Sequence, residues 1–309
     1  PEDWNELGRE KQLNHPAYRS AKLEAQKVKS RIKVYFKKVL PLMLRLTMHH
    51  PISVGRFSTG ISRADGGGPI HVARKSSNGE RVTVNSEEDL QYFLNHTRYP
   101  PGDSSFPAAQ DDGFRYLWWN PTTTGKNIKV SVIDCDNPAK LGRKEVKSVI
   151  TKLVKELDRL GHPNIIMHTG YSYQIWVGKR EGQPDWDMRE SEDYFRNILS
   201  GYGHYGLNTA KELAITNDTL HFDARTFQSD QPIRMFFSLH YPTPTSTGLK
   251  SWTGLAAIPL TLSDLKNFDQ NQHSHPENVL ANFDNLARLV TDFFDTVEVG
   301  QDYESEGDL

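Results

Sequence analysis

The stretch Lys129-Val-Ser-Val-Ile-Asp-Cys-Asp136 decides how this chain is interpreted. Polar and apolar residues alternate along it, which is typical of a half-buried strand whose side chains two apart point to one face. Asp134 and Asp136 are therefore expected side by side, where two unpaired carboxylates would repel each other. Cys135, between them, is expected on the opposite, buried face. A divalent cation is the simplest group that makes such a pair of carboxylates tolerable.

A third carboxylate, Asp223, ends another strand-like run, Thr219-Leu-His-Phe-Asp223. Added to Asp134 and Asp136, it would complete a two-metal site of the kind that supports phosphoryl transfer. The Asp-x-Asp pattern alone is a weak signal, and a capping or salt-bridged role for Asp223 stays open. The metal interpretation gains from position, because Asn137-Pro138 ends the strand and leaves both carboxylates at the edge of a sheet, where sites form.

Composition sets broad limits on the fold and the compartment. The 309 residues permit one large domain or two small ones, and 36% of them are hydrophobic, enough for a substantial core. The single cysteine excludes an internal disulfide and a CxxC zinc site. No apolar stretch is long enough to span a membrane and no signal peptide is visible, so we expect a cytoplasmic, intracellular protein without a membrane partner.

Charge and turn signals divide the chain into three parts. We expect a basic, helical N-terminal arm over residues 1–50, a catalytic core over 51–297 and an acidic tail over 298–309. The basic face of the arm, which includes Lys29, Lys33 and Lys37, is suited to contact a nucleic-acid backbone. A solvated helix face, with the other side packed on the core, is equally consistent with the pattern.

Hydrophobic periodicity predicts alternating strands and helices in the second half of the chain. The expected strands are Ile128–Asp134, Ile165–His168, Tyr173–Val177, Thr219–Asp223, Ile233–Leu239 and Leu255–Leu260, after short strands within 52–84. The expected helices are Ser86–Leu94, Lys144–Leu160, a stretch around 190–215 and Pro276–Phe294. This pattern favours an α+β fold with mixed or antiparallel sheets flanked by helices.

Four segments in a fixed order carry a family resemblance. They are Asp134-x-Asp136, Thr169-Gly-Tyr-Ser-Tyr-Gln-Ile-Trp-Val177, Phe222-Asp223, and Arg234-Met-Phe-Phe-Ser-Leu-His240 followed by Thr247-Gly-Leu249. Their order resembles the catalytic core of the archaeo-eukaryotic primase superfamily, which includes small primase subunits, primase-polymerases and the polymerase domain of bacterial end-joining ligases. The similarity extends over roughly residues 50–270. It implies a primase-like catalytic core with an RRM-like half.

The resemblance assigns roles to individual residues. Asp134, Asp136 and Asp223 match the family's catalytic carboxylates, which bind two Mg²⁺ or Mn²⁺ ions; no zinc is expected. The nucleotide-binding positions are matched by Ser172, Gln174, Arg234, Ser238 and His240, and Tyr171 is a candidate to stack on a base. The family's second motif reads Ser-x-His, whereas here glutamine stands in place of the histidine. Glutamine keeps a hydrogen-bond donor but loses the ability to carry a positive charge, a difference that bears on catalytic strength and not on the reaction class.

The expected activity is template-dependent nucleotidyl transfer, by a DNA primase or polymerase that joins NTPs or dNTPs. Its partners would be a DNA template or primer, the nucleotide, and proteins of replication or repair, in a prokaryote, a virus or a mobile element. Priming of replication and end-joining or gap-filling repair are both compatible with the motifs. Two other classes stay open: a catalytically weakened nucleic-acid-binding module of the same fold, suggested by Gln174, and a metal-dependent nuclease, since clustered aspartates also serve hydrolysis.

Overall fold

A computed structural model describes most of the second half of the chain and selected parts of the first. The described residues are 34–39, 41–43, 130–137, 140–170, 172–184, 186–206, 219–223, 233–239 and 255–299, with the backbone of strands at 52–56, 72–73, 83–84, 115–119 and 127–128. The predicted helix Ser86–Leu94 and the acidic tail from residue 300 lie outside this part of the chain.

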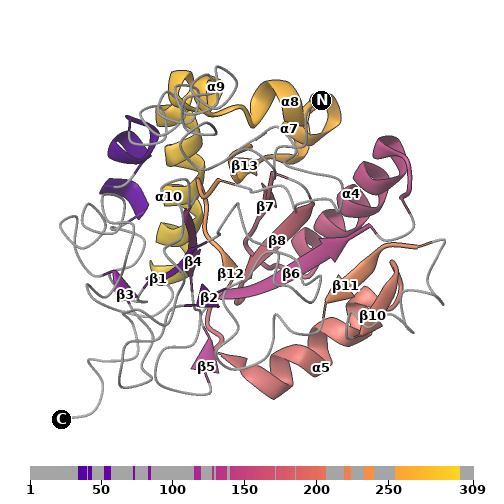
Figure 1. The fold of residues 1–309 in the computed structure, drawn as a ribbon. Coiled ribbons are helices and arrows are strands. Elements are labelled where there is room, and N and C mark those ends of the chain that lie inside the picture. Colours follow the sequence, from indigo (N-terminus) through magenta and orange to yellow (C-terminus); the bar gives the residue numbers. More distant parts are fainter. Residues whose placement is uncertain are drawn as a thin grey trace, which may run out of the picture.

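A six-stranded mixed sheet forms the centre of the fold (Figure 1). Its order is β10 (His204–Gly206), β11 (His221–Asp223), β6 (Val130–Asp136), β8 (Tyr173–Gly178), β7 (Asn164–His168) and β13 (Ile258–Leu260). The pair β10–β11 is parallel and the other pairs are antiparallel. The predicted mixed sheet with flanking helices is therefore confirmed.

Two further sheets are built from short strands. A five-stranded sheet has the order β12 (Ile233–Arg234), β4 (Arg115–Trp119), β1 (Ile52–Arg56) and β2 (Val72–Ala73), and β3 (Thr83–Val84) also pairs with β1. A two-stranded sheet joins β5 (Asn127–Ile128) to β9 (Trp186–Asp187). Strand β12 pairs with β4 through Arg234 and Trp118, so Arg234 enters the site region from the five-stranded sheet.

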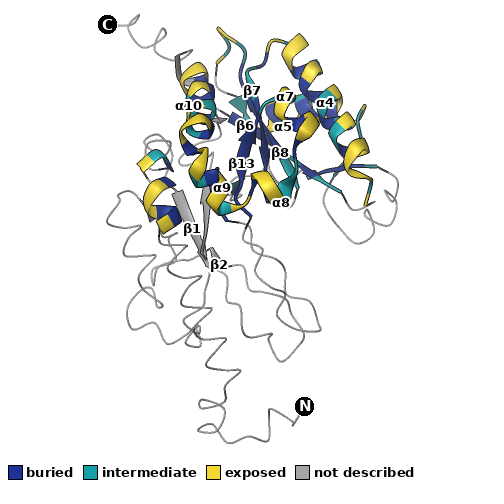
Figure 2. Cartoon of the chain, turned by 90° about the horizontal axis from the view of Figure 1, so that it is seen from above, coloured by how far each residue is buried: buried dark blue, intermediate teal, exposed yellow. Residues whose placement is uncertain are grey.

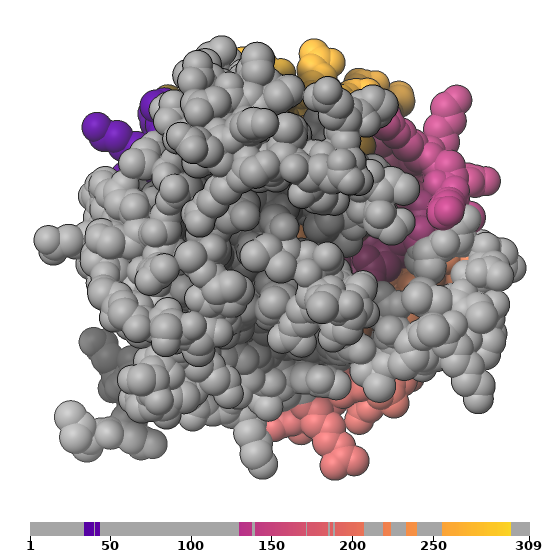
Figure 3. All heavy atoms as spheres, viewed as in Figure 1, coloured from indigo at the N-terminus to yellow at the C-terminus, as the bar shows by residue number. Residues whose placement is uncertain are grey.

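Helices cover both faces of the six-stranded sheet, and the strands between them are buried (Figure 2). Helix α4 (Arg143–Arg159) buries one stripe, made of Val146, Ile150, Leu153, Val154 and Leu157, as its 3.6-residue periodicity predicts. Helix α5 (Met188–Leu199) lies on the same face, because Ser191 meets Ser131 of β6 at 2.6 Å between hydroxyl oxygens. The outer sides of α4 and α5 reach the molecular surface (Figure 3).

Helix α10 (Phe283–Val299) covers the opposite face, and the C-terminal segment that contains it differs from the prediction of one helix over Pro276–Phe294. After α7 (Leu262–Asn267) and α8 (Gln270–His273), this segment forms two helices, α9 (Pro276–Ala281) and α10. Asn282 separates them, with its N–H donating to the carbonyl oxygens of Asn278 and Val279. Asparagine favours helix ends because its short polar side chain competes for nearby backbone groups. Phe294 of α10 packs on Trp176 of β8.

Two other predicted boundaries are wrong. The helix expected around 190–215 ends at Leu199, and a strand, β10, begins at His204. Gly203 allows the change, since a Cβ there would collide with the carbonyl oxygen of Leu220. The strand expected over Ile233–Leu239 stops at Arg234, and Phe237 takes a positive φ of 64° as the chain turns. The apolar run after Arg234 fills the core as a turn rather than as a strand.

Part of the predicted basic arm packs against the core. Residues 34–39 and 41–43 are helical, and the buried side chains among them are Tyr35, Phe36, Val39 and Met43. The Tyr35 hydroxyl donates to the Phe237 carbonyl at 2.9 Å, which ties this helix to the turn after β12. Lys37 is exposed, whereas Lys29 and Lys33 lie outside the described residues. Among the helices that the structure describes, none is long and apolar enough to cross a membrane.

Candidate active site

Three neighbouring strands bring the carboxylates together on one sheet face. In the antiparallel ladder between β6 and β8, Asp134 pairs with Gln174 and Cys135 pairs with Tyr173. On the other side of β6, Cys135 pairs with Phe222, so the next residue of β11, Asp223, lies beside Asp134. Because side chains alternate along a strand, Asp134, Asp136 and Asp223 share a face, and Cys135 is buried on the other. The alternation predicted from sequence is confirmed.

Burial and the neighbouring carboxylates change the protonation of Asp134. Burial raises the pKa of Asp134 to about 8, and the negative charges of Asp136 and then Asp223 add to the rise. The positive charge of Arg234 and a hydrogen bond from the Gln174 side chain act in the opposite direction and lower this pKa. One oxygen of Asp134, Oδ1, is buried and accepts no hydrogen bond from the described part of the chain. The surroundings of Asp134 therefore disfavour its charged form.

The carboxylate oxygens of the three aspartates are suited to bind a hard divalent cation. Carboxylate oxygens are the ligands that Mg²⁺ and Mn²⁺ take in proteins, and the buried Oδ1 of Asp134 has a lone pair left over. Among the described residues, no three His, Cys, Asp or Glu side chains are already gathered round one point as metal ligands. Asp136 and Asp223 lie near enough to Asp134 for their charges to raise its pKa.

The turn that precedes β8 is held by its own hydroxyl groups. Thr169 Oγ1 accepts from the Ser172 N–H at 2.9 Å and lies 3.1 Å from Ser172 Oγ, and the Thr169 N–H donates to the Ser172 carbonyl at 2.9 Å. Gly170 has a φ of 88°, a left-handed conformation that glycine adopts without strain. Ser172 is partly exposed and Gln174 is buried, with its Oε1 free of hydrogen bonds within the described residues.

Arg234 connects this turn to the carboxylates. Its Nη1 donates to the Thr169 carbonyl at 2.9 Å, which fixes the guanidinium at the turn before β8. From there its charge lowers the pKa of Asp134. It also lowers the pKa of His168, although burial is the largest cause of that shift, to about 3. His168, hydrogen-bonded to Ser274 at 3.1 Å, is thus a neutral core residue. The geometry joins Asp134, Gln174 and Arg234 in one electrostatic cluster.

The other predicted site residues are placed differently. Ser238 is fully buried, its hydroxyl makes no hydrogen bond within the described chain, and its carbonyl accepts from the Ala257 N–H at 2.8 Å. Its assignment to nucleotide binding stays a prediction. His240 and Tyr171 lie outside the described residues.

The sequence analysis did not single out two groups that lie at the same end of the sheet as the carboxylates. His221 lies directly across from Asp136, and its ring stacks on His204 of β10 at 5.4 Å between ring centroids. The second group is a set of basic side chains where β6 leads into α4, namely Lys140, Arg143 and Lys147. The sequence signal for the second group was available, since four cations within eight residues, Lys140 to Lys147, follow the Asp-x-Asp pattern.

The fold is similar to that of a solved polymerase domain. The chain is similar to the solved polymerase domain of Ligase D from Mycobacterium tuberculosis in complex with DNA, with a TM-score of 0.60 and 12% sequence identity. The match covers 86% of this chain and 91% of that one. This confirms the predicted resemblance at the level of the fold. No protein-family model matches the sequence, and no curated protein matches it either.

Proposed function

We propose that the chain is a template-dependent nucleotidyltransferase that joins NTPs or dNTPs on a DNA template with the help of two divalent ions. The observation that carries the proposal is the cluster of three carboxylates, in which burial and mutual repulsion raise the pKa of Asp134 to about 8. The similarity in fold to a polymerase domain that was solved with DNA supports it. Polymerisation is chemistry that such a cluster serves, because two ions held by it stabilise the attacking and the leaving oxygens of an in-line displacement.

The proposed site has two sides, which we call its walls. Carboxylates form one wall, and hydrogen-bond donors form the other. On one wall, Asp134, Asp136 and Asp223 would hold the ions, Mg²⁺ or Mn²⁺. On the other, the partly exposed Ser172 hydroxyl and the Arg234 guanidinium supply donors suited to phosphate oxygens. Gln174 lies between the walls and orients Asp134 through its side-chain hydrogen bond. Positioning and charge stabilisation are the main contributions that phosphoryl transfer takes from a protein.

Nucleotide incorporation on defined templates tests the proposal. With Mn²⁺ or Mg²⁺, we expect the protein to extend a labelled primer on a DNA template and to add nothing when the template is absent. A parallel reaction with template but without primer separates the biological roles, since products there indicate priming. Synthesis only from primers or annealed ends indicates end-joining or gap filling. If neither metal supports incorporation of NTPs or dNTPs, the enzyme proposal is wrong.

The same assay distinguishes the two other classes. A non-catalytic module of this fold would bind the template without extending it. A nuclease would shorten the labelled strand in the absence of triphosphates, and the donors of Ser172 and Arg234 would then have no nucleotide to bind. Gel analysis of strand length with and without triphosphates reports all three outcomes in one experiment.

Replacing Gln174 with leucine should weaken metal binding by about 10–100-fold, which is the usual cost of losing a group that orients a metal ligand. Leucine fills similar space but removes the hydrogen bond that favours the charged form of Asp134. Titration with Mn²⁺, followed by incorporation and by thermal shift, measures the change. Gln183→Leu is the matched control, because Gln183 accepts from Arg180 away from the carboxylates. Equal metal affinity in the Gln174 variant and the control would refute an orienting role.

A further inference from the structure

A small cavity of about 290 Å³ lies at the end of the sheet where β6 leads into α4. We call it the basic pocket and define it by Lys140, Arg143, Lys147, Ser172, Tyr173 and Phe268. Cys135 and Tyr173 belong to the face of the sheet opposite the carboxylates, so the pocket opens on the α4 side of the same sheet end. None of the roles assigned above uses its three cations.

The pocket carries an excess of positive charge. Among the described residues that line it are three cations and no carboxylate. Asp269, outside the lining, lies 3.5 Å from Arg143 and is exposed to solvent, so it offsets this charge weakly. Lys147 Nζ donates to the backbone carbonyls of Phe268, at 2.8 Å, and Lys266, at 3.4 Å. Partial burial lowers the pKa of Lys147, and the charge of Arg143 lowers it further. An anion in the pocket would relieve this repulsion, as a cation would among the aspartates.

Hydrogen bonds between Asn137 and the residues at 140 and 141 hold Lys140 in place ahead of α4. Asn137 Nδ2 donates to the Leu141 carbonyl at 3.0 Å, and Asn137 Oδ1 accepts from the Leu141 N–H at 2.9 Å. Lys140, inside this loop, is held at a φ of 53°, and its N–H donates to the Asn137 carbonyl at 3.2 Å. Helix α4 begins at Arg143 and runs for 17 residues, and the positive end of its dipole is partly offset by Glu145 in the first turn, whose carboxylate accepts from the Gly142 N–H at 2.7 Å.

The remaining walls are aromatic and polar, which suits a nucleotide unit better than a bare ion. The rings of Tyr173 and Phe268 lie 6.3 Å apart between centroids, and Lys147 Nζ lies 6.0 Å from the Phe268 ring. Burial raises the pKa of Tyr173 to about 12, so its hydroxyl stays protonated and can donate to an oxygen. Aromatic rings beside cations are the combination that binds single-stranded nucleic acid without sequence preference.

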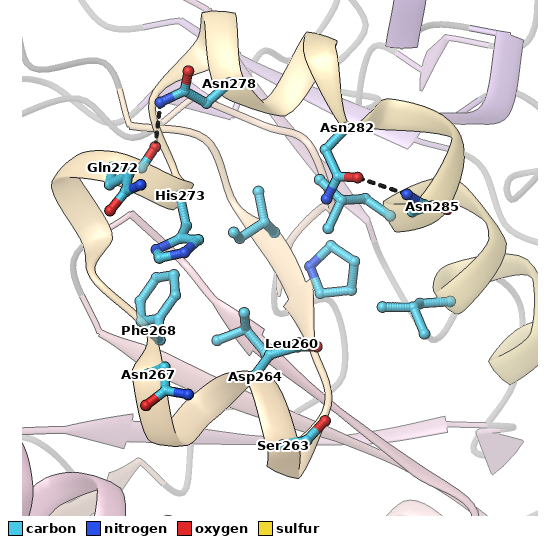
Figure 4. A pocket seen from close by; sticks show the side chains of 14 residues that line it. Leu260, Ser263, Asp264, Asn267, Phe268, Gln272, His273, Asn278, Asn282 and Asn285 are labelled. Carbon is cyan, nitrogen blue, oxygen red and sulfur yellow. Dashed lines mark hydrogen bonds between the residues drawn. The ribbon is translucent and has the colours of Figure 1, made fainter.

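A second cavity differs from the basic pocket in the charge of the residues that line it. This cavity, of about 600 Å³, lies between β13 and helices α7 to α10, at the sheet edge farthest from β11 (Figure 4). Carboxamides line much of it, among them Asn267, Asn278 and Asn285, and none of the lining residues that the structure describes is a lysine or an arginine. Such a lining has no charge with which to hold a phosphate. The basic pocket, in contrast, adjoins Asp136 through Asn137 and β8 through Ser172.

We propose that the basic pocket binds a backbone phosphate of the single-stranded nucleic acid that passes the carboxylates. The position of the pocket on the helix side of the sheet end indicates a strand that bends round this end rather than one confined to the carboxylate face. The identity of the ligand as a nucleic-acid strand, and not another phosphate ester, rests on the proposed function. The pocket's preference for phosphate rests on its own charges.

Strand binding without catalysis tests this assignment. The protein would carry Asp134→Asn and be assayed in EDTA with a fluorescent oligothymidylate at several salt concentrations. We expect Lys140→Ala/Arg143→Ala/Lys147→Ala to weaken binding at least tenfold. We also expect the slope of log affinity against log salt to fall by about 0.7, the change for the one backbone phosphate that the variant no longer neutralises. The control Lys144→Ala/Lys152→Ala/Lys155→Ala removes the same charge from exposed positions of α4 outside the pocket and should change affinity less than twofold.

Each further outcome has a defined meaning. Equal weakening in the pocket variant and the control overturns the proposal, since it would reflect the net charge alone. Displacement of the oligothymidylate by NTP or inorganic phosphate at similar concentration shows that the pocket takes a free phosphate, which overturns the assignment to a strand. If the Lys147 change lowers the Tm, Lys140→Ala/Arg143→Ala alone carries the test. Because catalysis is switched off throughout, failure of incorporation by the wild-type protein leaves this result unaffected.

Discussion

Asp134→Asn should abolish nucleotide incorporation and, in the absence of metal, make the protein more stable. Incorporation should fall at least about a thousandfold, because an ion position worth several kcal/mol to the transition state is lost. The gain in stability follows from the repulsion among Asp134, Asp136 and Asp223, which an amide at position 134 removes. Each kcal/mol relieved should raise the Tm by roughly 2–4 °C in a domain of this size.

The gain in stability from Asp134→Asn should increase as the pH rises. The pKa of Asp134 is about 8 in the folded protein and about 4 when unfolded, so the folded state binds more protons between these values. The contribution of Asp134 to the free energy of unfolding is therefore at its full value below about pH 4, and it is lost as the pH rises toward 8. The Tm difference between Asp134→Asn and wild type should grow over this range and level off above it. Thermal melts in EDTA from pH 5 to pH 9 measure it.

In the presence of Mn²⁺, the wild type should have a higher Tm than Asp134→Asn, the reverse of the order expected without metal. Mn²⁺ binds the folded wild type and should raise its Tm with concentration, whereas Asp134→Asn should respond weakly. Asp295→Asn, an exposed carboxylate on α10, controls for the loss of one charge and should leave both the melting curve and the metal response unchanged. A metal-free Asp134→Asn protein that melts below the wild type would contradict the electrostatic account of the site.

The sequence predicted those parts of this fold and site that depend on local periodicity. The stripe of α4 and the shared face of Asp134 and Asp136 follow from repeats of 3.6 and 2 residues, and both are present in the structure. The place of Asp223 beside Asp134 needed strand order, which only the resemblance supplied. The ends of α5 and β12 were missed because they depend on tertiary packing, as at Gly203 against Leu220. The basic pocket was missed because its walls come from segments far apart in the chain, such as Lys147 and Phe268.

Trp176→Ala should cost about 3–5 kcal/mol of unfolding free energy, the range for removing a fully buried large aromatic side chain. The indole packs on Phe236 at 4.7 Å and on Phe294 at 6.0 Å between ring centroids, so it joins β8 to the turn after β12 and to α10. Chemical denaturation measures the loss. Trp186→Ala is the matched control, because Trp186 is only partly buried and should cost clearly less.

The position of Trp176 links this stability to the site. Trp176 is two residues from Gln174 on the same strand face, and its partner Phe236 is two residues from Arg234. A cavity there should loosen both residues that act on Asp134, so folded Trp176→Ala should also bind metal and nucleotide more weakly. Trp176→Phe, which keeps an aromatic ring against Phe236, should restore most of the stability and the metal affinity together. If Trp176→Phe restores stability while metal affinity stays low, the site does not depend on this packing.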